Sequence, residues 1–133
     1  MAKIKLLIDS DILIDWLKGI KGAKDLFRTK EIDLYCSILS KKELLSKSGL
    51  RESERKRIID LLSRIKVLRL DDDINKKYFF LMKKYGEKSD WMADYIIAAT
   101  AWSKKLPLLT RNKKHFTRIE EIVLSPSYDT EPT

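Results

Sequence analysis

The feature that most constrains the fold is a short apolar run that ends in a carboxylate. Residues 4–8 read IKLLI, lack the alternation of a half-exposed strand, and are followed at once by Asp9. Such a run is typical of a strand buried on both faces, and these strands belong to parallel sheets covered by helices. A helical pattern follows over residues 11–18. We therefore expect Asp9 at the carboxyl edge of a parallel sheet, where open α/β sheets bind their ligands.

Strand-like and helix-like segments alternate along the rest of the chain. Further strands are expected at 33–38, 66–70, 106–110 and 122–124. Helices are expected at 11–18 and around 23–27, from Ser40 to about 47, at 52–65, from 74 to Gly86 and from Ser89 to about 103, with a turn or short helix at 113–119. The alternation predicts an α/β fold with a central, mainly parallel sheet of four or five strands and helices on both faces. We expect a single domain over residues 1–124 and a flexible C-terminal tail over 125–133.

Composition narrows the setting and the class of partner. The 133 residues, 44% of them hydrophobic, suffice for one domain with a core. The sequence has no apolar run of membrane-spanning length, its N-terminal run is too short for a signal peptide, and the single Cys36 allows no internal disulfide. These features predict a cytoplasmic protein without membrane contact. The net charge of +8 favours an anionic partner such as nucleic acid, although a lysine-rich solvated surface explains it equally well.

Asp94 is the carboxylate in the least polar setting. Its neighbours one helical turn away are Ile97 and Ala98, with Ala101 beyond them. A carboxylate on a core-facing stripe loses hydration unless it is paired, protonated or bound to a metal. A structural salt bridge is one explanation, but the apolar character of the rest of the stripe favours a functional site.

Two other acids allow two interpretations each, and a third allows one. Glu43 stands three residues after Ser40, the position of a capping box, but it also follows the second strand closely and so lies at the edge that carries Asp9. Asp11 can share a metal with Asp9 or simply stabilise a helix N-terminus. Asp15, one turn further on, is expected to be solvated.

Asp9, Glu43 and Asp94 therefore come from three elements that should converge at one edge of the sheet. Three nearby carboxylates repel one another unless they hold a hard cation, for which Mg²⁺ or Mn²⁺ is the natural choice. A chain with one Cys and one His cannot build a zinc site of those ligands. A divalent cation in such a pocket lowers the pKa of a bound water. That water can then lose a proton near neutral pH and become a nucleophile that attacks a phosphodiester.

A basic segment leaves the fourth expected strand at the same edge. Thr110 and Asn112 are expected to hydrogen-bond a water or a phosphate oxygen, and Arg111, Lys113 and Lys114 to hold a phosphate backbone. His115 is better interpreted as a phosphate contact or a structural residue than as a general base. A basic surface around an acidic pocket suits a protein that binds a polyanion and cuts it.

Taken together, these segments resemble the PIN domain, and more closely the VapC-type toxins of bacterial and archaeal toxin–antitoxin pairs. The resemblance rests on LLIDSDILIDWLKG, on SKKELL around Glu43, and on ADYIIAATAWSKKLPLLTRNKKHF, and covers the chain from about Leu6 to about Ile119. It implies a compact α/β domain, usually homodimeric. It also implies Mg²⁺- or Mn²⁺-dependent endoribonuclease activity that a small antitoxin inhibits.

The resemblance assigns roles to individual residues. It makes Asp9, Glu43 and Asp94 the three family acids, with Asp9 and Asp94 as the direct metal ligands. Asn112 stands where the family often carries a further acid, and His115 where many relatives have another Asp. This departure puts a second metal in question, although Asn112 can still orient a water or a metal through its carbonyl oxygen.

Three other functions compete with this one. A receiver domain needs a phospho-accepting Asp after the third strand and a Lys after the fifth, but Asp71 looks like a helix start and no Lys follows Val123. A haloacid-dehalogenase-type phosphatase would use Asp9 and Asp11, usually followed by Gly-Thr, where this chain has Ile12-Leu13. An RNA-binding PIN-like module with a degenerate site is disfavoured because all three acids are intact. The predicted function is hydrolysis of RNA phosphodiester bonds by a toxin endoribonuclease.

Overall fold

The computed structural model describes residues 3–128 and has a four-stranded parallel sheet at its centre. The strand order is β3-β2-β1-β4. The strands are β1 (Ile4–Ile8), β2 (Ile32–Ser37), β3 (Lys66–Leu68) and β4 (Leu108–Leu109). The predicted strand at 122–124 is reduced to one parallel bridge between Leu108 and Leu124. Its partner β4 is only two residues long, and Pro107 before it has no N–H to extend a ladder.

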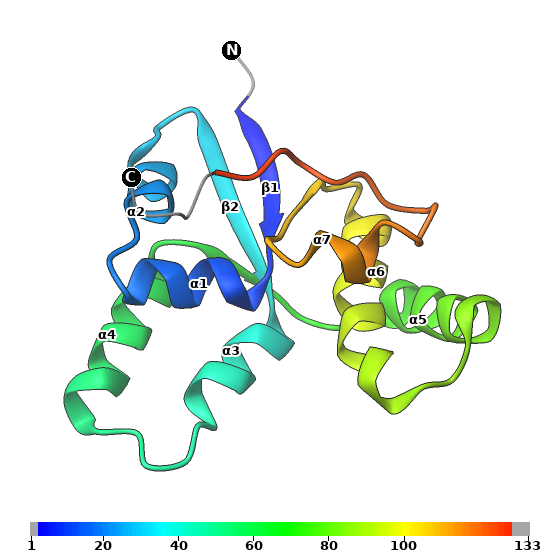
Figure 1. Ribbon diagram of the computed structural model, residues 1–133, viewed down its shortest axis with the longest axis horizontal. Helices are drawn as coiled ribbons and strands as arrows, with labels where there is room; N and C mark the ends of the chain where they lie inside the picture. The colour runs from blue at the N-terminus through cyan, green and yellow to red at the C-terminus, as the bar shows by residue number, and fades with distance from the viewer. Residues whose placement is uncertain (1–2, 129–133) are drawn as a thin grey trace.

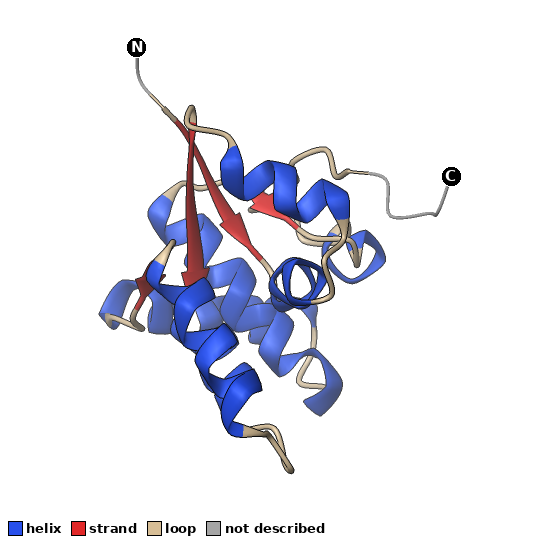
Figure 2. Cartoon of the chain, turned by 90° about the vertical axis from the view of Figure 1, so that its left-hand side faces the viewer, coloured by secondary structure: helices blue, strands red, loops and turns tan. Residues whose placement is uncertain are grey.

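Helices cover the sheet on both sides, as the alternation predicts (Figure 1). They are α1 (Ser10–Leu17), α2 (Lys21–Arg28), α3 (Ile38–Leu45), α4 (Glu52–Ser63), α5 (Asp72–Tyr85), α6 (Met92–Lys104) and α7 (Lys113–Phe116), with a 3-10 turn, η1 (Ser89–Trp91), before α6. In Figure 1, α1 to α4 lie on one side of the two long strands, β1 and β2, and α5 to α7 lie on the other. Figure 2 shows those two strands starting side by side near the N-terminus, with helices around them.

Alternate residues of β1 serve two separate apolar cores. Leu6 and Ile8 pack with α1, α3 and α4, whereas Leu7 faces the other way and packs with α5, α6 and α7. This follows from the period of two in a strand, because neighbouring side chains point to opposite faces. All three side chains are buried. The apolar IKLLI run is therefore explained by a strand that contributes to both cores.

The strand order places a ligand crevice beside β1. The chain proceeds from β1 to β2 and β3 in one direction, then returns to add β4 on the other side of β1. The carboxyl ends of β1 and β4 thus flank the point where the order reverses, which is where open α/β sheets bind ligands. Asp9 directly follows β1, and its N–H donates to the carbonyl oxygen of Leu109 at 3.0 Å. Thr110 directly follows β4.

Residues 125–128, which follow Leu124, contact the sheet and α1 in the structure. The N–H of Ser125 donates to the carbonyl oxygen of Leu108 at 2.8 Å, and the Tyr128 hydroxyl donates to Asp15. In Figure 1 this red segment returns across the long strands toward α2. The flexible tail over 125–133 stays a prediction: in this structure residues 125–128 have partners in the fold, one of them the buried Asp15, and residues 129–133 lie outside the described part.

Between residues 3 and 128, no helix combines the length and the hydropathy needed to cross a membrane.

Candidate active site

Asp9 is held from two sides at the end of β1. Its Oδ1 accepts a hydrogen bond from the Ser10 N–H at 2.7 Å, and its Oδ2 accepts one from the Thr110 hydroxyl at 2.9 Å. Thr110 is fully buried, and its oxygen accepts from the Asn112 N–H at 3.0 Å. Burial, followed by the charge of Asp94, raises the pKa of Asp9 above its usual value, although these hydrogen bonds act in the opposite direction. The carboxylate is thus fixed in place and poorly neutralised.

Glu43 reaches the same site from α3, but not through the predicted cap. Ser37 caps α3 by accepting from the Leu39 N–H at 3.1 Å, so the helix begins before Ser40 and the expected capping box does not form. Ser40 is instead buried and accepts from the Ser10 hydroxyl at 2.9 Å, which ties α3 to the start of α1. Glu43, one turn after Ser40, is therefore not engaged as a cap.

The pKa of Glu43 responds to the charges of the other two acids predicted from sequence. Burial raises this pKa, and the charges of Asp9 and Asp94 raise it further. The three carboxylates are therefore within electrostatic reach of one another. The acids that follow β1, lie on α3 and stand in the first turn of α6 thus influence one another electrostatically at the carboxyl edge of the sheet.

Asp94 lies in the first turn of α6 and is paired with His115. The predicted helix start at Ser89 is wrong, because residues 89–91 form a 3-10 turn and α6 begins at Met92. The Nδ1 atom of His115 lies 2.9 Å from Oδ2 of Asp94. Burial raises the pKa of Asp94, while the positive charges of His115 and Arg118 lower it. Sequence analysis missed this pair; the signal for it was a histidine six residues after β4, at the rim that holds Asp94.

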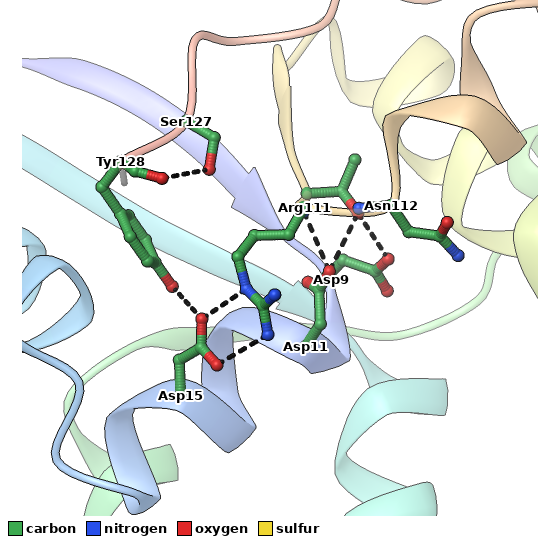
Figure 3. A network of polar contacts seen from close by, with 8 residues as sticks. Asp9, Asp11, Asp15, Arg111, Asn112, Ser127 and Tyr128 are labelled. Atoms are coloured by element: carbon green, nitrogen blue, oxygen red, sulfur yellow. Dashed lines mark hydrogen bonds and ion pairs between the residues drawn. The ribbon is translucent and has the colours of Figure 1, made fainter. Parts of the chain in front are cut away.

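Asp11 and Asp15 form a second acidic pair along α1 (Figure 3). Asp11 accepts from the Arg111 N–H at 2.9 Å through Oδ2, while its Oδ1 is buried and has no hydrogen-bond partner among the described residues. The expectation that Asp15 is solvated is wrong, because this residue is only 2% exposed. Arg111 donates to it from two nitrogens at 2.6 and 2.8 Å, and the Tyr128 hydroxyl at 2.7 Å. The error arose because its partners come from the segment after β4 and from the C-terminal segment.

The predicted substrate-positioning residues separate into two groups. The Thr110 hydroxyl and the Arg111 guanidinium are already bound to carboxylates, so in this structure they hold the site rather than face a phosphate. Asn112, Lys113 and Lys114 are exposed, and their side chains have no hydrogen bond or ion pair within residues 3–128.

The acids suit a hard divalent cation, with one restriction. Across residues 3–128, no three His, Cys, Asp or Glu side chains gather closely enough to surround one ion. A closed cage of three ligands is therefore not preformed. Mg²⁺, however, typically uses one or two carboxylates and keeps several waters. The unpartnered Oδ1 of Asp11 and the mutual repulsion of Asp9, Glu43 and Asp94 are what such a cation would relieve.

A groove of about 660 Å³ runs from this site between α1, α3 and α4. Ser10 and Glu43 form part of its lining, which also includes a second acid, Glu54. Its apolar lining consists of Ile14, Leu17, Leu44, Leu50 and Ile58, and its basic residues are Lys18, Lys47 and Arg57. The groove is thus a partly apolar surface that is continuous with the acids.

A parallel α/β sheet with acids at the point where its strand order reverses defines a class of fold, and comparison with known proteins identifies the family. Residues 6–122 match the PIN domain. The chain therefore belongs to the PIN domain family, as its motifs predicted.

Named relatives match the chain over most of its length. It is 33% identical over 121 residues to Ribonuclease VapC10 of Mycobacterium tuberculosis, covering 88% of this chain and 90% of that protein. It is 32% identical over 124 residues to Ribonuclease VapC1 of Methanocaldococcus jannaschii, covering 90% of this chain and 85% of that protein. A chain of a toxin-antitoxin complex from Klebsiella pneumoniae superposes with a TM-score of 0.72 at 29% identity, covering 89% and 95%. The predicted α/β fold is confirmed.

Proposed function

We propose that this protein is a metal-dependent endoribonuclease and the toxin of a toxin–antitoxin pair. The observation that carries the proposal is the convergence of Asp9, Glu43 and Asp94 beside the exposed basic start of α7. Similarity to two ribonucleases and to a chain of a toxin-antitoxin complex, over most of each chain, supports the same function. Membership of the PIN family disfavours the phospho-aspartate alternatives.

Asp9 and Asp94 would hold Mg²⁺, or Mn²⁺ in its place, with Glu43 beside them and Asp11 as an auxiliary ligand. The bound cation supplies an acidified water and offsets negative charge on the phosphate. Thr110 and the Ser10 N–H keep the Asp9 carboxylate in one orientation. His115 orients Asp94 and favours its ionised form. The chain thus supplies a pre-oriented acidic pocket, and pre-orientation is what an efficient site requires.

The exposed residues at the start of α7 would position the RNA. Lys113 and Lys114 carry free positive charge on the rim that holds the Asp94–His115 pair, and Asn112 adds an amide that can bind a phosphate oxygen. The net charge of +8 attracts a polyanion to this rim. Substrate binding should therefore weaken steeply with salt.

Cleavage of a defined RNA by the purified protein tests the function. The assay compares Mg²⁺, Mn²⁺ and EDTA, and wild type with Asp9→Asn and Asp25→Asn. Asp25 is an exposed acid on α2 that pairs with Lys21, so it controls for loss of a carboxylate elsewhere. We expect cleavage only with metal, its loss in Asp9→Asn and its retention in Asp25→Asn. Equal cleavage under all conditions would overturn the proposal.

The antitoxin is assigned to the groove between α1, α3 and α4. A small protein that fills this apolar groove would end beside Glu43 and Ser10 and could close the site. We also propose a homodimer, for which the exposed Phe79 and Phe80 of α5 offer an apolar surface. Sedimentation of the purified protein tests the dimer. A cytoplasmic location stays a prediction.

A further inference from the structure

Tyr128, the last residue of the C-terminal segment that the structure describes, contacts the acidic residues of α1. The Tyr128 hydroxyl donates to Oδ2 of Asp15 at 2.7 Å, although the two residues are 113 positions apart (Figure 3). The Tyr128 ring also lies directly on Gly22 of α2. A Cβ at position 22 would come within 2.4 Å of this ring, so the ring occupies space that only glycine leaves open. The segment is thus held at two points.

Asp15 connects Tyr128 to Arg111. The guanidinium donates to both carboxylate oxygens, from Nε at 2.6 Å and from Nη2 at 2.8 Å. Such a two-point pair fixes the plane and position of the arginine as well as supplying energy. A buried carboxylate is tolerated only when its oxygens are well bonded, and Tyr128 supplies the third hydrogen bond. Tyr128 and Asp15 together therefore restrict where Arg111 can lie.

Arg111 in turn is coupled to the acids through its backbone. Its N–H donates to Asp11 at 2.9 Å, and the preceding Thr110 donates to Asp9. Asp11 and Asp15 are four residues apart on α1 and share one face, so a single arginine spans both. A continuous chain of hydrogen bonds and one peptide link thus leads from Tyr128 to the carboxylate of Asp9.

We propose that Tyr128 and Arg111 are positioning residues, which fix residues 110–112 so that Asp9 and Asp11 are oriented for a divalent cation. The inference rests on the metal site of the proposed function and extends it to the C-terminal segment. A clamp that merely stabilises the fold would have the same contacts, but it would not affect cation affinity.

The first test is Mn²⁺ binding by the full-length protein without RNA, followed by the electron paramagnetic resonance signal of free Mn²⁺. Tyr128→Phe removes only the hydroxyl. Its Kd for Mn²⁺ should rise by about threefold to tenfold, the range for substitutions along a coupled network. Arg111→Met should raise it by about tenfold or more, as for residues that orient metal ligands. Tyr35→Phe is the matched control, because its hydroxyl has no hydrogen bond within the described part of the chain.

A second variant displaces the Tyr128 ring by changing the residue on which it packs, Gly22. Gly22→Ala places a methyl group where the ring lies, although alanine is the better helix former at this position in α2. We expect it to weaken Mn²⁺ binding like Tyr128→Phe. In a Tyr128→Ala background, which leaves no ring to displace, adding Gly22→Ala should not change the Kd further.

The outcomes separate the inference from the proposed function. Wild-type protein that binds no Mn²⁺, or binding unaffected by Asp9→Asn, would overturn the metal site itself. Normal Mn²⁺ binding that depends on Asp9 but stays unchanged in folded Tyr128→Phe and Gly22→Ala would overturn only the positioning role. Far-UV circular dichroism establishes folding for each variant.

Discussion

The Thr110 hydroxyl donates to Oδ2 of Asp9 across 2.9 Å and so joins the first residues after β4 and β1. Thr110→Val keeps the side-chain shape, but it leaves Asp9 without this donor and the Asn112 N–H without its acceptor. We expect RNA cleavage to fall about 10-fold to 100-fold. The free energy of unfolding, measured in urea, should fall by about 1–3 kcal/mol because a buried group loses its partner.

Thr110→Ser is the control for this substitution, since it keeps the hydroxyl and removes only a methyl group. It should cleave RNA within a few-fold of wild type. A folded Thr110→Val variant with wild-type cleavage would show that the hydroxyl does not orient Asp9.

Asp9→Asn should make the metal-free protein more stable at neutral pH. Burial, with the charge of Asp94 next, raises the folded-state pKa of Asp9 above 3.8. The folded protein then binds this proton more tightly than the unfolded chain, so the free energy of unfolding falls as pH rises through the folded pKa. Asparagine avoids that loss and still caps α1, and stabilisation by about 0.5–2 kcal/mol is typical of relieved functional sites.

The measurement is urea unfolding of wild type and Asp9→Asn in EDTA. The advantage of the variant should be full at neutral pH and vanish below the ordinary pKa of aspartate, where Asp9 is protonated in both states. A variant that is less stable than wild type at neutral pH would contradict the cause assigned to the pKa shift.

Asp9 and Asp94 could be placed from sequence because local patterns constrain them. An apolar strand ends at Asp9, and the apolar neighbours of Asp94 on its helix are buried as predicted. The start of α3 could not be decided in this way. Ser37 and Ser40 are both good caps. The structure favours Ser37 because Ser40 is required for the contact with Ser10, a residue thirty positions away.

The Asp15–Arg111–Tyr128 network could not be predicted for a similar reason. Each partner comes from a different part of the chain, and a C-terminal segment with prolines and polar residues is typical of a loose end. The packing of Tyr128 on Gly22 and its hydrogen bond to Asp15 show where the segment is held. Long-range pairing of this kind leaves no periodic signal in the sequence.

His115→Gln should shift the acidic limb of the pH dependence of RNA cleavage to higher pH. The positive charge of His115 lowers the pKa of Asp94, against the larger effect of burial. Glutamine can still donate a hydrogen bond but carries no charge, so Asp94 would take up a proton at higher pH and lose its ionised form sooner. Initial rates across mildly acidic to neutral pH measure the shift.

Lys114→Gln provides the control for His115→Gln, because it removes a positive charge from the same short helix without a contact to Asp94. It should weaken RNA binding and leave the acidic limb where it is. Equal shifts in both variants would mean that the overall charge of α7, not the His115–Asp94 contact, sets the profile.

Ile14→Glu should disrupt binding of the antitoxin, while Ile59→Glu should not. Both isoleucines are exposed, at 39% and 50%, so neither substitution buries a charge in the core. Ile14 lines the groove between α1, α3 and α4, whereas Ile59 lies on α4 outside it. A charge in an apolar contact is expected to weaken binding by at least about tenfold. Titration calorimetry with the purified cognate antitoxin measures the affinities, and equal affinities of the two variants would place the antitoxin on another surface.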